Sequence, residues 1–455
     1  MKRNRLLAAF LLAAVFAGSL VASRVDAQDA KGVKPLEAIG LYTFSNPRTN
    51  ETSPQDEPKQ NPVVTALDVY ATPQGKTLFY AGGDSQRFYV RNVKDVEGIG
   101  DKGFVSVVEK ADANGANKTV FKKPYSSAGD EGAPINDWIR AISVNPATKE
   151  VATLSQRGRV AIWSPQDWEQ FDKWNDPETI QWKQVVHWDA PAGVNNGARA
   201  MKFSPNGKIL AVCGFDPLVR FYCYEGKESS FSCSDFKPIQ GWPALSQSCT
   251  TLDFYSDRDP DTGRCLSTLL AVGGRNGAWI WNVATGDLLK KIELSDRKLS
   301  DKNKNNSRRV RAVAFSPDGT RLAVAGDADR IMIWNLASDK DEFSEISLLD
   351  ERGTASRKIF SMTFTDDNTL ATGDSVNDVI LWNVSTGEMK AIGKGLDVYE
   401  SKGKEGDSSN GAIRTPAHSG TVATLVYVEN EKDPVAPRSL LSGGFDALVI
   451  RWALP

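Results

Sequence analysis

The stretch from Val310 to Asn335 reads VRAVAFSPDGTRLAVAGDADRIMIWN and contains three short apolar runs separated by polar turns. The first run, Val310–Phe315, is joined to the second by the sequence Ser-Pro-Asp-Gly. Because proline fixes φ and glycine tolerates positive φ, this sequence favours a tight turn between antiparallel strands. The second run ends at Gly326, and the third ends at Trp334. Both faces of these runs are apolar, which indicates strands buried on both sides.

The same pattern recurs along the chain. We expect the first strand of each copy at Val64–Val69, Ile139–Val144, Ala198–Phe203, Cys249–Phe254, Val310–Phe315, Ile359–Phe364 and Val422–Tyr427, so that the copies start near 63, 138, 197, 248, 309, 358 and 421. In copies two to seven the third run ends in an aromatic residue: Trp163, Tyr222, Trp281, Trp334, Trp382 and Trp452. Recurring three-stranded units with a fourth strand between copies are typical of a β-propeller. The sequence therefore predicts an all-β fold, a seven-bladed propeller of four-stranded antiparallel blades over residues 28–455.

The last copy stops at Pro455, directly after its third strand. A strand-like segment at about 36–44 precedes the first copy. We expect this segment to complete the last blade, which would close the ring and remove an exposed sheet edge.

The turn and strand motifs resemble those of WD40-repeat proteins, and in particular of exported bacterial members of that family. They include Met201–Gly207 (MKFSPNG), Ala314–Gly319 (AFSPDG) and Ile380–Val384 (ILWNV). The resemblance covers residues 36–455, although the copies are degenerate. It implies a non-catalytic scaffold that docks another protein through loops on one face and at the mouth of the central channel.

The amino terminus has the pattern of a secretory signal peptide. Lys2, Arg3 and Arg5 precede an apolar stretch that ends at Gly18, and Val25-Asp26-Ala27 offers a cleavage site. We therefore expect residues 1–27 to be removed and the protein to be exported, either periplasmic or secreted. An uncleaved anchor is the alternative. After cleavage no second long apolar segment remains, so no membrane span is expected.

Charge and histidine content limit the classes of ligand. Removal of residues 1–27 would change the formal net charge from −2 to −5, which disfavours nucleic acid as a partner. The chain contains two histidines, His187 and His418, and no C-x-x-C motif. We therefore expect no metal, no haem and no other cofactor. Oligomeric state stays open.

All five cysteines lie between 213 and 265, and an exported protein favours disulfides among them. We expect Cys223–Cys233 and Cys249–Cys265 as pairs, with Cys213 left over. Other pairings remain open from sequence alone.

His418, Ser442 and Asp446 have the residue types of a nucleophilic triad. No Gly-x-Ser-x-Gly elbow surrounds Ser442, which would lie inside a strand. With Trp452 their spacing resembles the structural hydrogen-bond network of WD40 blades, and we expect that role. In the other copies, which depart from this pattern, packing should supply the rigidity.

Three arginines share one position in three first strands: Arg140, Arg199 and Arg311. Near the mouth of a channel they could hold an anionic ligand or an acidic peptide, although arginine is also common there in WD40 repeats. Trp138 precedes one of these strands. Long connections at 45–62, 109–137, 295–309 and 393–420 would emerge on the same face, where long insertions often mark a binding surface. Simple drift of loop length is the alternative.

Five of the twelve tryptophans lie within 163–188. Ser164-Pro165 could start a short helix that gathers Trp168, Phe171 and Trp174 on one side. That side would bind a partner or a sugar, or would fold against the second blade. The rival functions are therefore a carbohydrate-binding propeller that uses the Trp163–Trp188 cluster and an envelope hydrolase or lyase with acid/base residues on its loops.

Overall fold

The computed structural model describes the chain in segments that are rich in β-strand. They are residues 33–36, 38–43, 63–71, 77–83, 88–92, 139–165, 182–189, 197–215, 218–223, 248–258, 265–275, 277–293, 309–328, 330–338, 342–348, 357–393, 418, 420–429, 438–446 and 448–455. Within these segments the fold is all-β, without a helix, and no element has the length and hydropathy of a membrane-crossing helix.

The described strands form seven sheets, and within each sheet successive strands pair antiparallel. The sheets follow the order of the chain and are numbered one to seven here. Their strands are β3 (Val64–Ala71), β4 (Thr77–Gly83) and β5 (Phe88–Asn92); β6 (Ile139–Val144), β7 (Val151–Ser155), β8 (Arg159–Pro165) and β9 (Trp182–Asp189); β10 (Ala198–Phe203), β11 (Ile209–Gly214) and β12 (Val219–Cys223); β13 (Cys249–Arg258), β14 (Cys265–Gly274), β15 (Gly277–Asn282) and β16 (Leu288–Glu293); β17 (Val310–Phe315), β18 (Arg321–Gly326), β19 (Arg330–Asn335) and β20 (Phe343–Ser347); β21 (Ile359–Asp366), β22 (Thr369–Asp374), β23 (Val379–Asn383) and β24 (Met389–Gly393); and β25 (Val422–Val428), β26 (Ser439–Gly444) and β27 (Leu448–Ala453).

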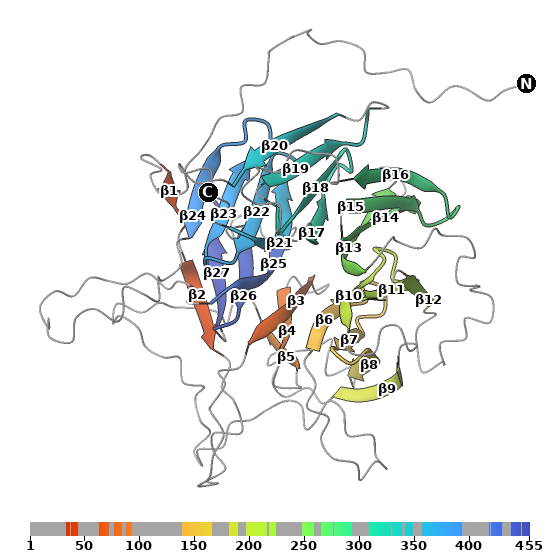
Figure 1. The fold of residues 1–455 in the computed structure, drawn as a ribbon. Helices are drawn as coiled ribbons and strands as arrows, with labels where there is room; N and C mark the ends of the chain where they lie inside the picture. The colour runs from red at the N-terminus through yellow and green to blue at the C-terminus, as the bar shows by residue number, and fades with distance from the viewer. Residues whose placement is uncertain are drawn as a thin grey trace, which may run out of the picture.

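The first strand of each sheet is the innermost one. Each contacts the first strand of the next sheet, in the order β3, β6, β10, β13, β17, β21 and β25, and β25 in turn contacts β3. Figure 1 shows the sheets gathered around a common centre, with these strands facing it. The architecture is consistent with a WD40 propeller.

Side chains hold neighbouring innermost strands in register. The N–H of Val144 donates to a carboxylate oxygen of Asp68 at 2.7 Å, and the N–H of Phe315 donates to Asp253 at 3.0 Å. Donor and acceptor belong to adjacent sheets in each pair. In both pairs the two innermost strands therefore begin on the same side.

The core lies between the sheets rather than on one face of each. The second strands β7 and β22 are buried along their whole length, because both of their faces meet a neighbouring sheet. Large tryptophans close these interfaces, and Trp281, Trp382 and Trp452 are among the largest fully buried side chains. This arrangement explains the continuous apolar runs of the sequence.

The Ser-Pro-Asp/Asn-Gly turns adopt the predicted geometry. Gly207 and Gly319 have φ of +73° and +69°, in the left-handed region that glycine tolerates. Their N–H groups donate to the carbonyls of Ser204 and Ser316 at 2.8 and 2.9 Å. The turns thus set the hairpins that join the first and second strands.

Two N-terminal strands attach to the last two sheets. β2 (Ala38–Thr43) pairs antiparallel with β27, so it occupies the outer edge at which the sequence predicted a strand from 36–44. β1 (Lys34–Pro35) pairs parallel with β24 of sheet six, a pairing that the sequence did not indicate. Leu36 is buried between the two sheets with Trp452.

The predicted pair Cys249–Cys265 is wrong, because Cys249 forms a disulfide with Cys213. Cys213 lies on β11 of sheet three and Cys249 starts β13 of sheet four, and both are fully buried. Sequence proximity favoured a link within one hairpin, whereas the contact between sheets decides the pairing. The other predicted pair, Cys223–Cys233, stays a prediction, because Cys233 lies outside the described residues.

Candidate binding surface

Each innermost strand carries a register shift after its first residue. The pairing passes directly from residue one to residue three, so the second residue forms a bulge in all seven sheets. We call these the position-two residues: Thr65, Arg140, Arg199, Thr250, Arg311, Phe360 and Ala423. Bulges bend a strand and redirect a side chain, often near functional sites. The side on which the innermost strands begin is called here the arginine face.

Two position-two residues connect adjacent sheets. The hydroxyl of Thr65 donates to the carbonyl of Ile139, and the hydroxyl of Thr250 donates to the carbonyl of Val310. These threonines are therefore used for packing the sheets together.

The three position-two arginines each contact a residue that directly follows the second strand of their own sheet. Arg140 Nη2 donates to Gln156 Oε1 at 2.6 Å. The guanidinium of Arg199 lies 4.2 Å from the ring centroid of Phe215. In sheet five Arg311, whose side chain is 24% exposed, forms an ion pair with Asp327, whose side chain is 3% exposed.

The guanidinium of Arg311, which pairs with Asp327, also lies 4.5 Å from the ring centroid of Phe360 in the next sheet. The side chains that follow the second strands thus hold the guanidinium groups in place. Fixed arginines lose less conformational entropy when they bind than free ones do.

The arginines are close enough to repel one another. Burial, followed by the positive charges of Arg140, Arg309 and Arg311, lowers the pKa of Arg199 to about 10. Arg309 directly precedes β17 and forms a backbone bridge with Arg275. Arginine remains protonated at neutral pH at such a pKa, so this part of the arginine face is positively charged.

Exposed apolar side chains are found on the same face. Phe215, Leu218, Val376 and Phe445 lie in turns between second and third strands and are 44%, 46%, 41% and 40% exposed. The other large apolar residues exposed in the described part, Leu288 and Leu289, belong to the outer strand β16. A gathering of exposed apolar groups on one face is typical of an interaction surface.

The remaining residues proposed from sequence have other places. Trp138, Trp168, Phe171 and Trp174 lie outside the described residues. The predicted helix start at Ser164-Pro165 is wrong, because both residues belong to strand β8.

Trp163, counted in the tryptophan cluster, is 5% exposed, and its indole N–H donates to Thr153 at 2.9 Å. It is a core residue and cannot stack on a sugar.

His418, Ser442 and Asp446 contact one another as a nucleophilic triad would. His418 Nε2 lies 2.7 Å from Ser442 Oγ, and His418 Nδ1 lies 2.9 Å from Asp446 Oδ2. However, His418 and Ser442 are fully buried, and the indole N–H of Trp452 donates to Ser442 Oγ at 2.7 Å. No substrate can reach the hydroxyl in this arrangement, whereas each polar group finds a partner.

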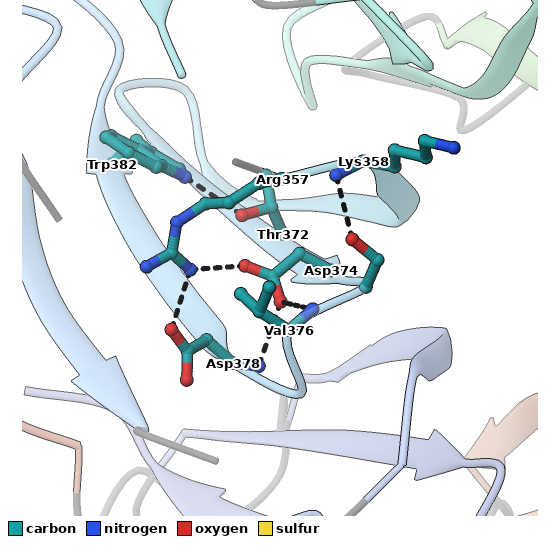
Figure 2. A network of polar contacts seen from close by, with 8 residues as sticks. Arg357, Lys358, Thr372, Asp374, Val376, Asp378 and Trp382 are labelled. Carbon is teal, nitrogen blue, oxygen red and sulfur yellow. Dashed lines mark hydrogen bonds and ion pairs between the residues drawn. The ribbon is translucent and has the colours of Figure 1, made fainter. Parts of the chain in front are cut away.

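Sheet six contains a buried ionic network that sequence reasoning missed. Arg357 Nη1 donates to Asp374 Oδ2 at 2.5 Å and to Asp378 Oδ2 at 2.6 Å (Figure 2). Asp374 Oδ1 also accepts the N–H groups of Val376 and Asp378, both at 2.9 Å. Figure 2 places this network beside Trp382, whose indole N–H donates to Thr372 at 2.9 Å.

The expectation that packing alone rigidifies this sheet is therefore wrong. Arg357 precedes the first strand, as His418 does in sheet seven, while Asp374 ends the second strand and Asp378 follows it. That spacing of charges was the available signal.

Two segments, residues 184–223 and 298–335, match the family model "WD domain, G-beta repeat". The first segment contains most of β9 and all of β10–β12, and the second contains β17, β18 and β19 of sheet five. These two segments are therefore similar to WD40 repeats. Such repeats generally mediate protein–protein interactions and are typically non-enzymatic scaffolds.

Among curated proteins the chain is similar to fungal proteins named HIR1. It is 24% identical to that of Gibberella zeae over 203 residues, which are 44% of this chain and 18% of the relative. It is 24% identical to the Aspergillus oryzae protein over 207 residues, which are 44% of this chain and 18% of the relative. It is also 24% identical to the Emericella nidulans protein over 230 residues, which are 49% of this chain and 20% of the relative. The chain thus matches about a fifth of the length of these relatives.

Proposed function

We propose that this protein is an exported, non-catalytic WD40 propeller that holds a protein partner on its arginine face. The observation that carries the proposal is the convergence of the position-two arginines with exposed apolar side chains on that face. Phe215 and Phe445 supply anchors of the kind that dominate interface energies, and arginine is enriched in such interfaces.

The scaffold we propose is a closed ring of seven blades. The cyclic contacts of the innermost strands, from β3 round to β25 and back, support closure. The antiparallel pairing of β2 with β27 supports the same view, because it joins residues near both ends of the described chain in one sheet. A closed ring leaves few free edges and keeps the arginine face rigid.

Export is proposed from residues 1–27, which have the charge and hydropathy pattern of a signal peptide but lie outside the described residues. The buried disulfide between Cys213 and Cys249 favours the same compartment, since disulfides persist in oxidising environments. The periplasm and secretion both fit.

Absence of catalysis is proposed from the burial of the residues that make triad contacts in the described part of the chain. Ser442 is enclosed, accepts a hydrogen bond from Trp452 and lies in the middle of β26. A nucleophile needs access to substrate and a nearby oxyanion site.

The test is affinity capture with the purified protein and two variants that each remove one exposed apolar side chain. Phe445→Ser alters the arginine face, whereas Leu289→Ser, at a residue 55% exposed on the outer strand β16, is the matched control. We expect the unchanged chain and Leu289→Ser to retain one protein in stoichiometric amount. Phe445→Ser should retain less of it.

Loss with Leu289→Ser alone would move the site to the outer side of the sheets. If no protein is retained at stoichiometric amount, the scaffold function is wrong.

A further inference from the structure

The positive charges at position two of the arginine face lie in sheets two, three and five. Arg140, Arg199 and Arg311 occupy position two of sheets two, three and five, while Arg275 and Arg309 face each other across a backbone bridge beside sheet four. Within the described residues of these turns, the buried carboxylate is that of Asp327, which pairs with Arg311.

Two of these arginines have unused hydrogen-bonding capacity. Arg199 rests on the ring of Phe215, and among the described residues it has no ion-pair partner. Arg309 Nε is buried and finds no hydrogen-bond acceptor within the described part of the chain. A buried donor without an acceptor is unfavourable, so Arg309 should gain by meeting an anion.

The rest of the arginine face is uncharged at position two. There the sequence places Phe360, Ala423 and Thr65 in sheets six, seven and one. The exposed side chains of Val376 and Phe445 lie in the turns of sheets six and seven. At position two, a ligand that covers the whole face would therefore meet guanidinium groups in sheets two, three and five and uncharged groups in sheets six, seven and one.

We propose that the arginine face binds an acidic peptide segment of a partner protein, with its carboxylates on sheets two to five and an adjoining apolar side chain on sheets six and seven. This inference rests on the proposed function and names the chemistry of its partner. Carboxylates match the planar guanidinium fork and can accept two hydrogen bonds from it. Fixed arginines discriminate in favour of such groups, because like charges would be repelled.

A peptide fits this face better than a nucleic acid. A polynucleotide needs positive charge along its path, whereas here position two is uncharged in sheets six, seven and one and the whole chain carries −2. A peptide can place an apolar side chain directly beside its carboxylates. The exposed ring of Phe445 then has a partner that a phosphate backbone would not offer.

The experiment measures fluorescence anisotropy with a labelled peptide in which runs of glutamate flank a pair of leucines. A second peptide carries glutamine at every glutamate. The protein variants are Arg199→Gln and Lys208→Gln. Each removes one positive charge, but Lys208 is exposed in the turn between β10 and β11, at the opposite ends of the strands.

We expect the glutamate peptide to bind and the glutamine peptide to bind at least about tenfold more weakly, as loss of a charge-assisted hydrogen bond implies. Arg199→Gln should weaken binding of the glutamate peptide about tenfold, and Lys208→Gln should leave it unchanged. Arg309→Gln provides an independent variant should Arg199→Gln fail to fold.

Equal binding of the two peptides, or an equal loss with Lys208→Gln, would overturn the inference. So would tighter binding of a single-stranded oligonucleotide, which would assign the site to nucleic acid. The scaffold function is tested separately: if Arg199→Gln retains the captured protein fully, the acidic ligand is wrong and the scaffold stands.

Discussion

The disulfide between Cys213 and Cys249 joins two sheets, and its contribution to stability follows from the length of chain that it closes. The two cysteines are separated by 36 residues in sequence. In the chain-entropy model, a cross-link over such a loop removes about 13 cal/mol/K from the unfolded ensemble, which is about 4 kcal/mol at 25 °C. We therefore expect reduction to lower the free energy of unfolding by about 4 kcal/mol.

The assay is a urea titration followed by tryptophan fluorescence, with and without a thiol reductant. The matched control is the double variant Cys213→Ala/Cys249→Ala, which cannot form this bond. Any effect of the reductant that persists in the control comes from the other cysteines. The difference between the two effects isolates the bond between sheets three and four.

A difference of less than about 1 kcal/mol would refute the loop-entropy reasoning, because that model predicts several times more. Peptide mapping of the non-reduced protein provides the second check. Recovery of Cys249 linked to Cys265, instead of Cys213, would contradict the pairing itself.

Three further predictions concern single residues. Gly319→Ala should destabilise the protein by more than Gly387→Ala. Both glycines have φ near +70°, but only at Gly319 would a new Cβ lie 2.2 Å from the ring of Tyr255. Thermal unfolding should show a loss of stability of about 1 kcal/mol for Gly387→Ala and clearly more for Gly319→Ala. Ser442→Ala should lower the free energy of unfolding by about 2 kcal/mol, because it leaves a buried indole N–H and an imidazole nitrogen without partners; an unchanged urea midpoint would contradict that role. Burial raises the pKa of Asp374 to about 6 from an ordinary 3.8, so the folded state binds more protons between these values and this residue's contribution to stability falls as pH rises through that window. Urea titrations across this pH window should show that the free energy of unfolding of Asp374→Asn rises relative to that of the unchanged protein as pH rises. A difference that does not depend on pH would contradict the raised pKa of Asp374.

Much of the strand arrangement was predictable because local patterns carry it. Apolar runs ending in glycine or tryptophan located the innermost strand of each sheet, as at Ile139–Val144 and Val310–Phe315. The helix start expected at Ser164-Pro165 was wrong because a favourable capping sequence is a weak local signal. Pairing of β8 with β9 overrides it, extending as far as Pro165 opposite Trp182.

The candidate site was predictable only in part. The shared position of Arg140, Arg199 and Arg311 was visible in sequence, but the nearness of Arg309 to Arg199 became apparent only in the fold. The apolar half of the face was not apparent, because Phe445 resembles a core residue until its exposure of 40% is known.

The repeat, the turn chemistry and the strand alternation were determined by the sequence itself, since each depends on residues within a few positions of one another. The partner of Cys249, the ionic network around Arg357 and the gathering of arginines were decided by tertiary structure. These contacts join residues on different sheets or at the adjacent ends of neighbouring strands. Their distances depend on how neighbouring sheets pack, and that packing reflects the volumes of the whole core rather than any local pattern.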